Sequence, residues 1–321
     1  MGMDLLGVDG DVVVGHGDVQ SGAALGVMTC ANHVGAHAYI VIDAINTTIE
    51  DAVHTLERSG ASSLIITPAQ ASEMMKQDSV LVVVDTQRAS NTVAPELLTQ
   101  TEHIVLIDHH RRNADYIDNA TLHYLETRAS SASEMVTEVM QYFADNVKPA
   151  AFTCSALLAG ITVDTKQFAF NVGSRTFDAA GYLRRNGADL SSVKLMFQND
   201  FSSYVRCANV VERATIRKSG IAISVVDPNV PDGQLLAAQA ADELLGIRNI
   251  YAAFVLAPLE DMIAISGRSY GQINVQVILE KLGGGGHLTM AGAQLRGVTV
   301  EEALAQLEEA IDTYERETPE H

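Results

Sequence analysis

Residues 103–112 read HIVLIDHHRR, an apolar run that ends in an aspartate, two adjacent histidines and two arginines. Short continuous apolar runs are typical of strands buried on both faces of a parallel sheet. Packing alone does not explain two histidines directly after an aspartate, because such side chains are seldom buried without a polar partner. The stretch therefore predicts a buried strand that carries Asp108, His109 and His110 to its carboxyl end.

The rest of the first half of the chain alternates short apolar runs with helical patterns. Besides 103–108, strands are predicted at 12–15, 38–42, 63–67 and 80–85. Helices are predicted at 22–33, 49–59, 68–76, 95–101, 133–143 and 150–164. Continuous apolar strands separated by helices favour an α/β fold, in which helices cover both faces of a mostly parallel sheet.

The second half of the chain predicts a smaller α/β domain. Its strands are expected at 215–226, 250–256, 262–268 and 291–295, and its helices at 234–245, 274–282 and 300–315. A length of 321 residues exceeds the size at which one core keeps growing. We therefore expect one domain over 1–190, a helical linker over 191–213 and a second domain over 214–321.

Composition limits the classes of partner. The formal net charge of −19 repels nucleic-acid backbones and anionic lipid headgroups, so a small anionic substrate requires cations supplied locally. The widely spaced Cys30, Cys154 and Cys207 predict free thiols in a reducing compartment. Because no apolar run is long enough for a membrane helix and no signal peptide opens the chain, we expect a cytoplasmic protein with no membrane segment.

Acidic and histidine side chains follow several of the apolar segments at their carboxyl ends. They are His16 with Asp18, Asp85, the Asp108–His110 group, and Asp164. Ligands bind at that edge of an open α/β sheet, and His with Asp suits Mn²⁺ or Mg²⁺. Two such ions can clamp a phosphoryl group and activate water. Taken singly, Asp85 and Asp164 could instead cap a helix or turn, and His16 could be a hydrogen-bonded structural residue.

A glycine run in the second half predicts a site for an anion. Gly284, Gly285 and Gly286 belong to GGGGH, which we expect to expose successive backbone N–H groups at a helix-like turn. A flexible turn is the alternative, but His287 after the run and Arg268 on a neighbouring strand favour phosphate binding. Further substrate-binding candidates are Ser130, Ser131 and Arg175, for which helix capping and a solvated surface arginine are the alternatives.

Several of these motifs together resemble a known family. VVVDT (82–86), VLIDHHRR (105–112) and GITVDTKQF (160–168), in this order, are similar to the DHH phosphoesterase superfamily. SGRS (266–269) and LGGGGHLTMAGAQL (282–295) resemble its companion DHHA1 domain. The segments IDHHRRNADYI and NVQVILEKLGGGGHLT are most similar in sequence to cyclic-di-AMP phosphodiesterases of the GdpP type.

The resemblance implies a metal-dependent hydrolysis of cyclic-di-AMP to the linear dinucleotide pApA. It makes Asp85 the bridge between two Mn²⁺ ions, His109 a ligand of one ion and Asp164 a ligand of the other. Asp108 would orient its neighbours, and His110 would bind or protonate the scissile phosphate. His16 would be the histidine of the first motif, and Asp18 a further candidate ligand.

The resemblance also implies features of the second domain and of the whole protein. Arg268 and His287 would grip the dinucleotide. A homodimer is expected. Full-length members of this branch carry membrane helices and sensory domains, so the chain could be the excised cytosolic part of a membrane-anchored protein.

The first motif departs from the family pattern of His, three residues, Asp, one residue, Asp. Here His16 is followed by Gly17, Asp18, Val19 and Gln20, so the segment is about three residues short. The site could assemble with fewer protein ligands, or hold one ion and be slow or inactive. Two alternatives to the cyclic-di-AMP phosphodiesterase therefore stay open: a phosphodiesterase of short oligoribonucleotides such as pApA, and a catalytically impaired module that only binds dinucleotides.

Overall fold

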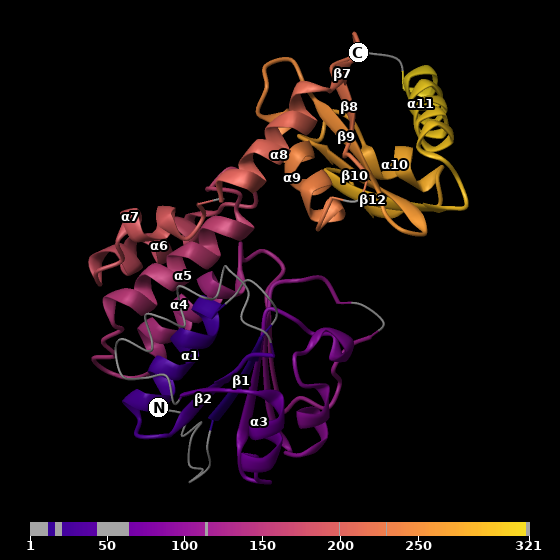
Figure 1. The fold of residues 1–321 in the computed structure, drawn as a ribbon. Coiled ribbons are helices and arrows are strands. Elements are labelled where there is room, and N and C mark those ends of the chain that lie inside the picture. The colour runs from indigo at the N-terminus through magenta and orange to yellow at the C-terminus, as the bar shows by residue number, and fades with distance from the viewer. Residues whose placement is uncertain are drawn as a thin grey trace. The chain divides into compact units, whose positions relative to one another are not determined.

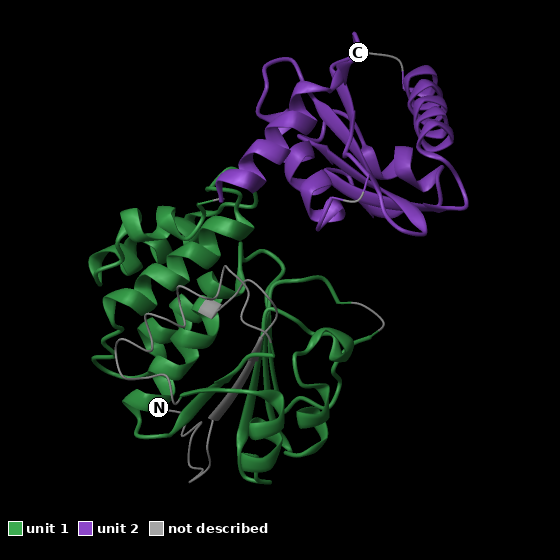
Figure 2. Cartoon of the chain, viewed as in Figure 1, with its two compact units in different colours: residues 1–198 green, residues 199–321 purple. Residues whose placement is uncertain are grey.

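The structure, a computed structural model, describes residues 12–16, 21–43, 64–112, 115–198, 200–228 and 230–318, with side chains from Gly22 onward. The chain forms two compact units, residues 1–198 and 199–321 (Figure 2). The boundary lies inside the segment 191–213 that was predicted as a linker. Its first part, α7 (Leu190–Leu195), packs on α5 of the first unit, and α8 (Phe201–Glu212) packs on α9 of the second.

The first unit is built on a parallel sheet with the strand order β3-β2-β1-β4-β5-β6. The strands are β1 (Val12–His16), β2 (Ala38–Val41), β3 (Ile65–Ile66), β4 (Val80–Val84), β5 (His103–Asp108) and β6 (Leu122–Leu125). Every residue of β4 is buried, as its sequence VLVVV predicts for a strand covered on both faces.

Helices cover both faces of this sheet (Figure 1). One face packs against α1 (Ser21–His33), α4 (Ala132–Phe143) and α5 (Ala151–Asp164). The other face packs against α3 (Pro68–Met74) and the 3-10 helices η2 (Ala89–Asn91) and η3 (Pro95–Thr99). The predicted α/β fold class is confirmed.

Among the described residues of this unit, the strand β6, the helix α6 (Ser174–Arg185) and the short 3-10 helix η2 escaped prediction. β6 is a short edge strand whose residues are half-buried or exposed, so its sequence LHYL lacks the continuous apolar run of the central strands. The helix α6 is polar on average and buries few residues. The segment 95–101, predicted as a helix, forms the 3-10 helix η3, and the predicted helix 49–59 lies outside the described residues.

The second unit contains a mixed sheet with the strand order β11-β12-β10-β9-β8-β7, in which β8 and β9 are parallel and the other neighbours antiparallel. Its strands are β7 (Thr215–Ile216), β8 (Ile221–Val225), β9 (Ala252–Pro258), β10 (Met262–Ser269), β11 (Gly285–His287) and β12 (Met290–Arg296). The predicted single strand 215–226 is thus two strands, because the chain turns at Gly220, where φ is 77°.

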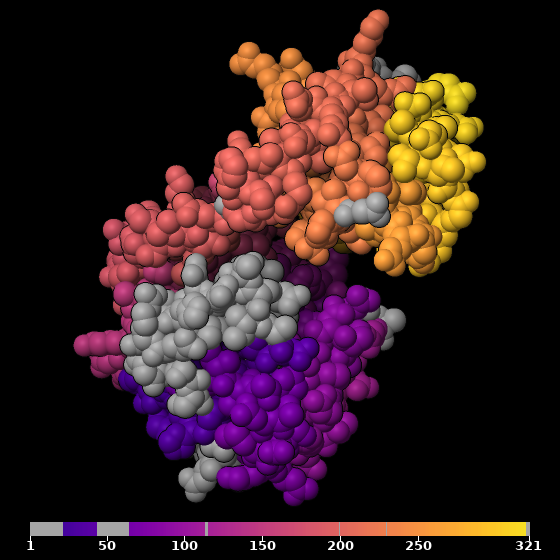
Figure 3. Space-filling model, viewed as in Figure 1, coloured from indigo at the N-terminus to yellow at the C-terminus, as the bar shows by residue number. Residues whose placement is uncertain are grey.

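Helices pack on both faces of this second sheet as well. One face packs against α8 and α9 (Gly233–Leu245), and the other against α10 (Val275–Glu280) and α11 (Val300–Glu317). The space-filling view shows α11, in yellow, along one side of this unit (Figure 3). Within the described ranges, no helix combines the length and apolar character needed to cross a bilayer.

The contact between α1 and α5 matters for the site, because Asp164 is the last residue of α5. The two helices approach so closely that a Cβ on Gly22 would lie 2.3 Å from the carbonyl oxygen of Ala156. Gly26, one turn further on, would meet the side chain of Val136 on α4. The small residues of α1 therefore set how near α4 and α5 lie to α1.

This close approach gives a stability test. We expect Gly22→Ala to lower the free energy of unfolding by about 1–3 kcal/mol, because the added methyl group overpacks the contact with α5. The matched control is Gly181→Ala in α6, where the added Cβ meets only the flexible end of Arg185. The control is expected to be neutral or to gain about 0.5–1 kcal/mol, since alanine favours a helix. Denaturant midpoints measure both, and an unchanged midpoint for Gly22→Ala contradicts the packing described.

Candidate active site

The candidate site lies at the carboxyl edge of the first sheet. The strand order runs outward from β1 in one direction through β2 and β3, and in the other through β4 and β5. The order therefore reverses between β1 and β4, which is where ligands bind in open α/β sheets. His16 ends β1 opposite Val84 of β4, and Asp108 ends β5 on the other side of β4.

Asp85 follows β4 directly and leaves the strand in a left-handed conformation, with φ of 64°. Its backbone N–H donates to the carbonyl oxygen of Ile107, 2.9 Å away, so the bend stays attached to β5. Aspartate tolerates this region better than most residues, and such strained positions gather at functional sites. The Asp85 side chain is 18% exposed.

His109 brings two segments that are far apart in the sequence to one point. Its Nε2 lies 3.4 Å from Oδ1 of Asp85 and 3.8 Å from Oδ2 of Asp164. Burial acts to lower the pKa of His109, but the carboxylates of Asp85 and Asp164 outweigh burial and raise the pKa above its ordinary value. One imidazole thus faces two carboxylates in a largely buried setting.

Asp108 and His110 form a second pair beside this group. Oδ1 of the fully buried Asp108 lies 2.6 Å from Nδ1 of His110 and accepts the His110 backbone N–H. The hydrogen bond that His110 donates to Asp108 raises the pKa of His110. Burial acts to raise the pKa of Asp108, but the hydrogen bonds from His110 prevail and lower it. The His110 side chain is 57% exposed, so its other ring nitrogen is the one available to a substrate.

The residues present fit a divalent cation. Asp85, His109 and His110 each offer a ligand atom, and these atoms lie within 4.8 Å of one another. Oδ1 of Asp85 is buried and, beyond the 3.4 Å approach of Nε2 of His109, makes no hydrogen bond to a described residue. A buried carboxylate oxygen without a hydrogen bond is costly, and a metal ion would supply a closer positive partner. Histidine with carboxylates suits Mn²⁺, Mg²⁺ or Zn²⁺.

The altered first motif stays untested. The backbone of His16 is described as the end of β1, but its side chain and all of Asp18 and Gln20 lie outside the described residues. Whether His16, Asp18 and Gln20 bind a metal ion therefore stays a prediction, and so does the number of ions in the site.

In the second unit, the structure places Arg268 and His287 in one row across the sheet. Arg268 of β10 and His287 of β11 both pair with Met290 of the strand β12 between them. Directly opposed residues of antiparallel strands point to the same face. The Arg268 side chain is 12% exposed and its Nε lies 3.4 Å from Asp242 of α9, whereas His287 is exposed. Both candidate residues thus share one face.

The glycine run is not the single helix-like turn that was predicted, because Gly283 lies in the turn after α10 whereas Gly285 and Gly286 belong to a strand. Residues 285–287 form β11, paired with β12. A Cβ on Gly284 would lie 2.3 Å from the carbonyl oxygen of Gly292, and one on Gly286 would lie 2.4 Å from that of Met290. Gly285 has open space beside it. Close packing against β12 explains two of the three glycines, and substrate binding by the run stays a prediction.

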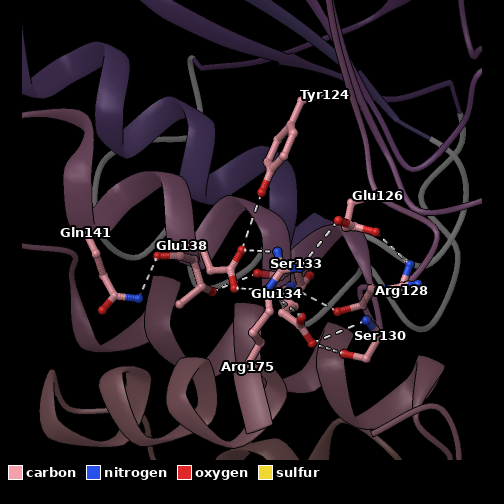
Figure 4. A network of polar contacts seen from close by, with 11 residues as sticks. Tyr124, Glu126, Arg128, Ser130, Ser133, Glu134, Glu138, Gln141 and Arg175 are labelled. Atoms are coloured by element: carbon pink, nitrogen blue, oxygen red, sulfur yellow. Dashed lines mark hydrogen bonds and ion pairs between the residues drawn. The ribbon is translucent and has the colours of Figure 1, made fainter. Parts of the chain in front are cut away.

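The remaining substrate candidates have protein partners. The Ser130 hydroxyl donates to the buried carboxylate of Glu134, and the Ser131 hydroxyl caps α4 by accepting the Glu134 backbone N–H. Arg175 makes two hydrogen bonds to Glu138 of α4 (Figure 4). Substrate contacts by these three residues stay predictions.

Sequence reasoning missed one residue that supports the site. Gln87 is buried, and its Nε2 donates to the carbonyl oxygen of His110, 2.8 Å away. The amide thus links the segment after β4 to the segment after β5. The only sequence signal was its place two residues after Asp85, which does not reveal burial.

Family models match both units. The DHH family N-terminal domain matches residues 12–161, and the DHHA1 domain matches residues 218–316. The chain carries a DHH domain followed by a DHHA1 domain. The predicted resemblance is therefore confirmed, and Asp85 and His109 lie within the matched part of the DHH domain.

Known proteins similar to this DHH–DHHA1 chain include cyclic-di-AMP phosphodiesterases and bifunctional oligoribonucleases. The cyclic-di-AMP phosphodiesterase GdpP of Geobacillus thermodenitrificans is 45% identical over 91% of this chain. This match covers 45% of the relative, so the chain spans about half the length of such relatives. The bifunctional oligoribonuclease and PAP phosphatase NrnA of Thermus thermophilus is 27% identical over 74% of this chain and 72% of its own length.

A solved structure supports the fold of both domains. An exopolyphosphatase-related protein from Bacteroides fragilis aligns with a TM-score of 0.80 over 97% of this chain and 94% of its own. The sequence identity is 18%, so this likeness concerns the DHH–DHHA1 fold alone.

Metal binding can be tested without substrate. We expect Asp85→Asn to weaken Mn²⁺ binding at least about tenfold, since changes even to residues behind metal ligands cost about 10–100-fold. Titration of free Mn²⁺ by electron paramagnetic resonance measures the affinity. Asp118→Asn, which changes an exposed aspartate of the same domain, is the control and is expected to bind Mn²⁺ like wild type. Equal binding by wild type and Asp85→Asn contradicts the site.

Proposed function

We propose that the chain is a divalent-metal-dependent phosphodiesterase that hydrolyses cyclic-di-AMP to pApA. The observation that carries the proposal is the meeting of Asp85, His109 and Asp164 at the carboxyl edge of the DHH sheet. The 45% identity to a cyclic-di-AMP phosphodiesterase supports the substrate class. Two Mn²⁺ ions are the proposed cofactors, with Mg²⁺ as the alternative, and a cytoplasmic homodimer is the proposed form.

Each residue of the DHH site has a proposed part. Asp85, His109 and Asp164 would hold the cation, with His16 and Asp18 as further candidate ligands. A divalent cation bound there supplies positive charge to the phosphoryl oxygens and lowers the pKa of water. Because Asp108 occupies Nδ1 of His110, Nε2 of His110 is left to hydrogen-bond the scissile phosphate. The raised pKa of His110 increases its protonated share, which favours donation of a proton to the leaving oxygen.

The acidic composition of the chain favours additional positive charge at the substrate. A formal net charge of −19 opposes the approach of a dinucleotide with two phosphates. Arg268 and His287 lie on one face of the DHHA1 sheet, next to Gly285, where the backbone is open to a ligand. We propose that this face binds the phosphates or the bases of the substrate.

One observation favours each of the two alternatives, the oligoribonucleotide phosphodiesterase and the dinucleotide-binding module. The chain is also similar to an oligoribonuclease and PAP phosphatase over 74% of its length, which favours a short linear substrate such as pApA. The shortened first motif, with Gln20 near the place of an acidic ligand, favours a module that binds dinucleotides without turnover.

Turnover is the direct test of the proposal. We expect purified protein with Mn²⁺ to convert cyclic-di-AMP to pApA, as measured by liquid chromatography and mass spectrometry. Chelation of the metal and Asp85→Ala should each abolish the product, because both empty the site. If wild type makes no product while wild type and Asp85→Ala bind cyclic-di-AMP equally, the protein is a binding module. Faster turnover of pApA or of short oligoribonucleotides than of cyclic-di-AMP would favour the oligoribonuclease alternative.

Substrate binding by the face of the DHHA1 sheet that carries Arg268 and His287 can be tested separately. We expect Arg268→Met to raise KM for cyclic-di-AMP roughly ten- to hundredfold, since a hydrogen bond to a charged group contributes about 1.5–3 kcal/mol. Mn²⁺ affinity should not change, because Arg268 belongs to the other unit. Arg248→Met, at an exposed position of the same unit, is the control and should keep KM. A normal KM in Arg268→Met contradicts substrate binding by this face.

A further inference from the structure

Arg175 is surrounded by carboxylates from two other elements (Figure 4). Its Nε and Nη2 donate to the two oxygens of Glu138 on α4, at 2.7 and 2.6 Å. Its Nη1 lies 3.6 Å from Glu126, the residue after β6, and its Nε lies 4.0 Å from Glu134. One guanidinium therefore holds three acidic side chains, and their proximity raises the pKa of Arg175, with the Glu138 hydrogen bonds as the main cause.

The charge around Arg175 argues against a role in gripping phosphate. Three carboxylates against one guanidinium leave the cluster negative, so its field repels an anionic substrate. The bidentate bond to Glu138 also occupies the Nε and Nη2 donors, and the remaining Nη1 faces the carboxylate of Glu126. The Arg175 side chain is 43% exposed, so small solutes can still reach it.

One end of the cluster is joined to the DHH motif through the backbone. The N–H of Glu126 donates to the carbonyl oxygen of Asp108, 3.1 Å away, and extends the pairing of β5 with β6 by one more bond. The Glu126 side chain also accepts the backbone N–H of Arg128. A guanidinium that holds Glu126 therefore holds the strand end that borders Asp108, His109 and His110.

The other end of the cluster is joined to Asp164. Arg175 stands at the start of α6, and the connection from Asp164 to α6 contains three consecutive left-handed residues. These are Lys166, Gln167 and Phe168, with φ of 46°, 59° and 63°. Such conformations cost about 1–2 kcal/mol each and persist only where the surroundings hold them. The stacking of Phe168 on Phe177 of α6, with ring centroids 5.9 Å apart, attaches this turn to the same helix.

We propose that Arg175 is a positioning residue of the metal site. By joining α6 to Glu126 and Glu138, it fixes the strained turn after Asp164 relative to the strand end at Asp108. That spacing sets the approach of Asp164 to His109, where Nε2 and Oδ2 are 3.8 Å apart. The inference rests on the metal-dependent activity proposed above, but it also predicts a change in metal affinity that is measured without substrate.

The test compares Arg175→Met with Arg185→Met, which removes an exposed arginine at the other end of α6. We expect Arg175→Met to weaken Mn²⁺ binding and to lower kcat, each at least about tenfold, with KM for cyclic-di-AMP unchanged. Millimolar guanidinium should restore part of both losses in Arg175→Met, because the vacated place is open to solvent. Arg185→Met should behave like wild type with and without guanidinium.

A second variant keeps the proposal testable if Arg175→Met fails to fold. Glu126→Gln removes the charge that faces Arg175 but keeps an oxygen to accept the Arg128 N–H. It should lower Mn²⁺ affinity and kcat in the same way, and its effect should not add to that of Arg175→Met, since both break one connection.

The outcomes separate the possible roles of Arg175. A raised KM with kcat and Mn²⁺ affinity unchanged would show a substrate contact and overturn the proposal. Normal Mn²⁺ affinity and kcat in Glu126→Gln, or losses that guanidinium does not restore in folded Arg175→Met, would also overturn it. If wild type binds Mn²⁺ but does not cleave cyclic-di-AMP, the proposed function fails, while the Mn²⁺ titrations still decide the part of Arg175.

Discussion

The placement of His109 between the carboxylates of Asp85 and Asp164 is the constraint on which the rest of the site depends. Two like charges near one imidazole repel each other unless a proton or a metal ion lies among them. The repulsion between these carboxylates is sustained because each residue is attached to a well-packed element of the fold. A buried strand ends at Asp85, its neighbour ends at Asp108, and a helix packed against α1 ends at Asp164.

The proposed function places the same electrostatic demand on both domains. An acidic protein that acts on phosphates would have to collect positive charge where it is used. In the proposal, the DHH domain does so by binding a cation, and the DHHA1 domain offers Arg268, which shares one face of its sheet with His287. The positive charge of Arg175, by contrast, partly neutralises acidic residues of the protein itself, because its guanidinium is enclosed by Glu126, Glu134 and Glu138.

Prediction from sequence succeeded where one segment carried its own signal. The strand before Asp108, the strand before Asp85 and the helix that ends at Asp164 were all recognisable as apolar runs with a polar end. β6 and α6 were missed because a half-exposed edge strand and a polar helix lack that pattern. The glycine run was assigned to a turn, because a sequence does not show that Gly284 and Gly286 press against the backbone of β12.

The sequence by itself determined the α/β fold class and the DHH and DHHA1 domains, and it singled out Asp85, His109 and Asp164 as candidate ligands, because motif order and residue type can be read without the fold. Only the tertiary structure decided which side chains are near enough to interact. The distance from His109 to Asp164, the row that joins Arg268 to His287, and the partners of Arg175 all depend on how separate segments pack. Contacts between residues tens of positions apart follow from strand order and helix packing, which no single motif encodes.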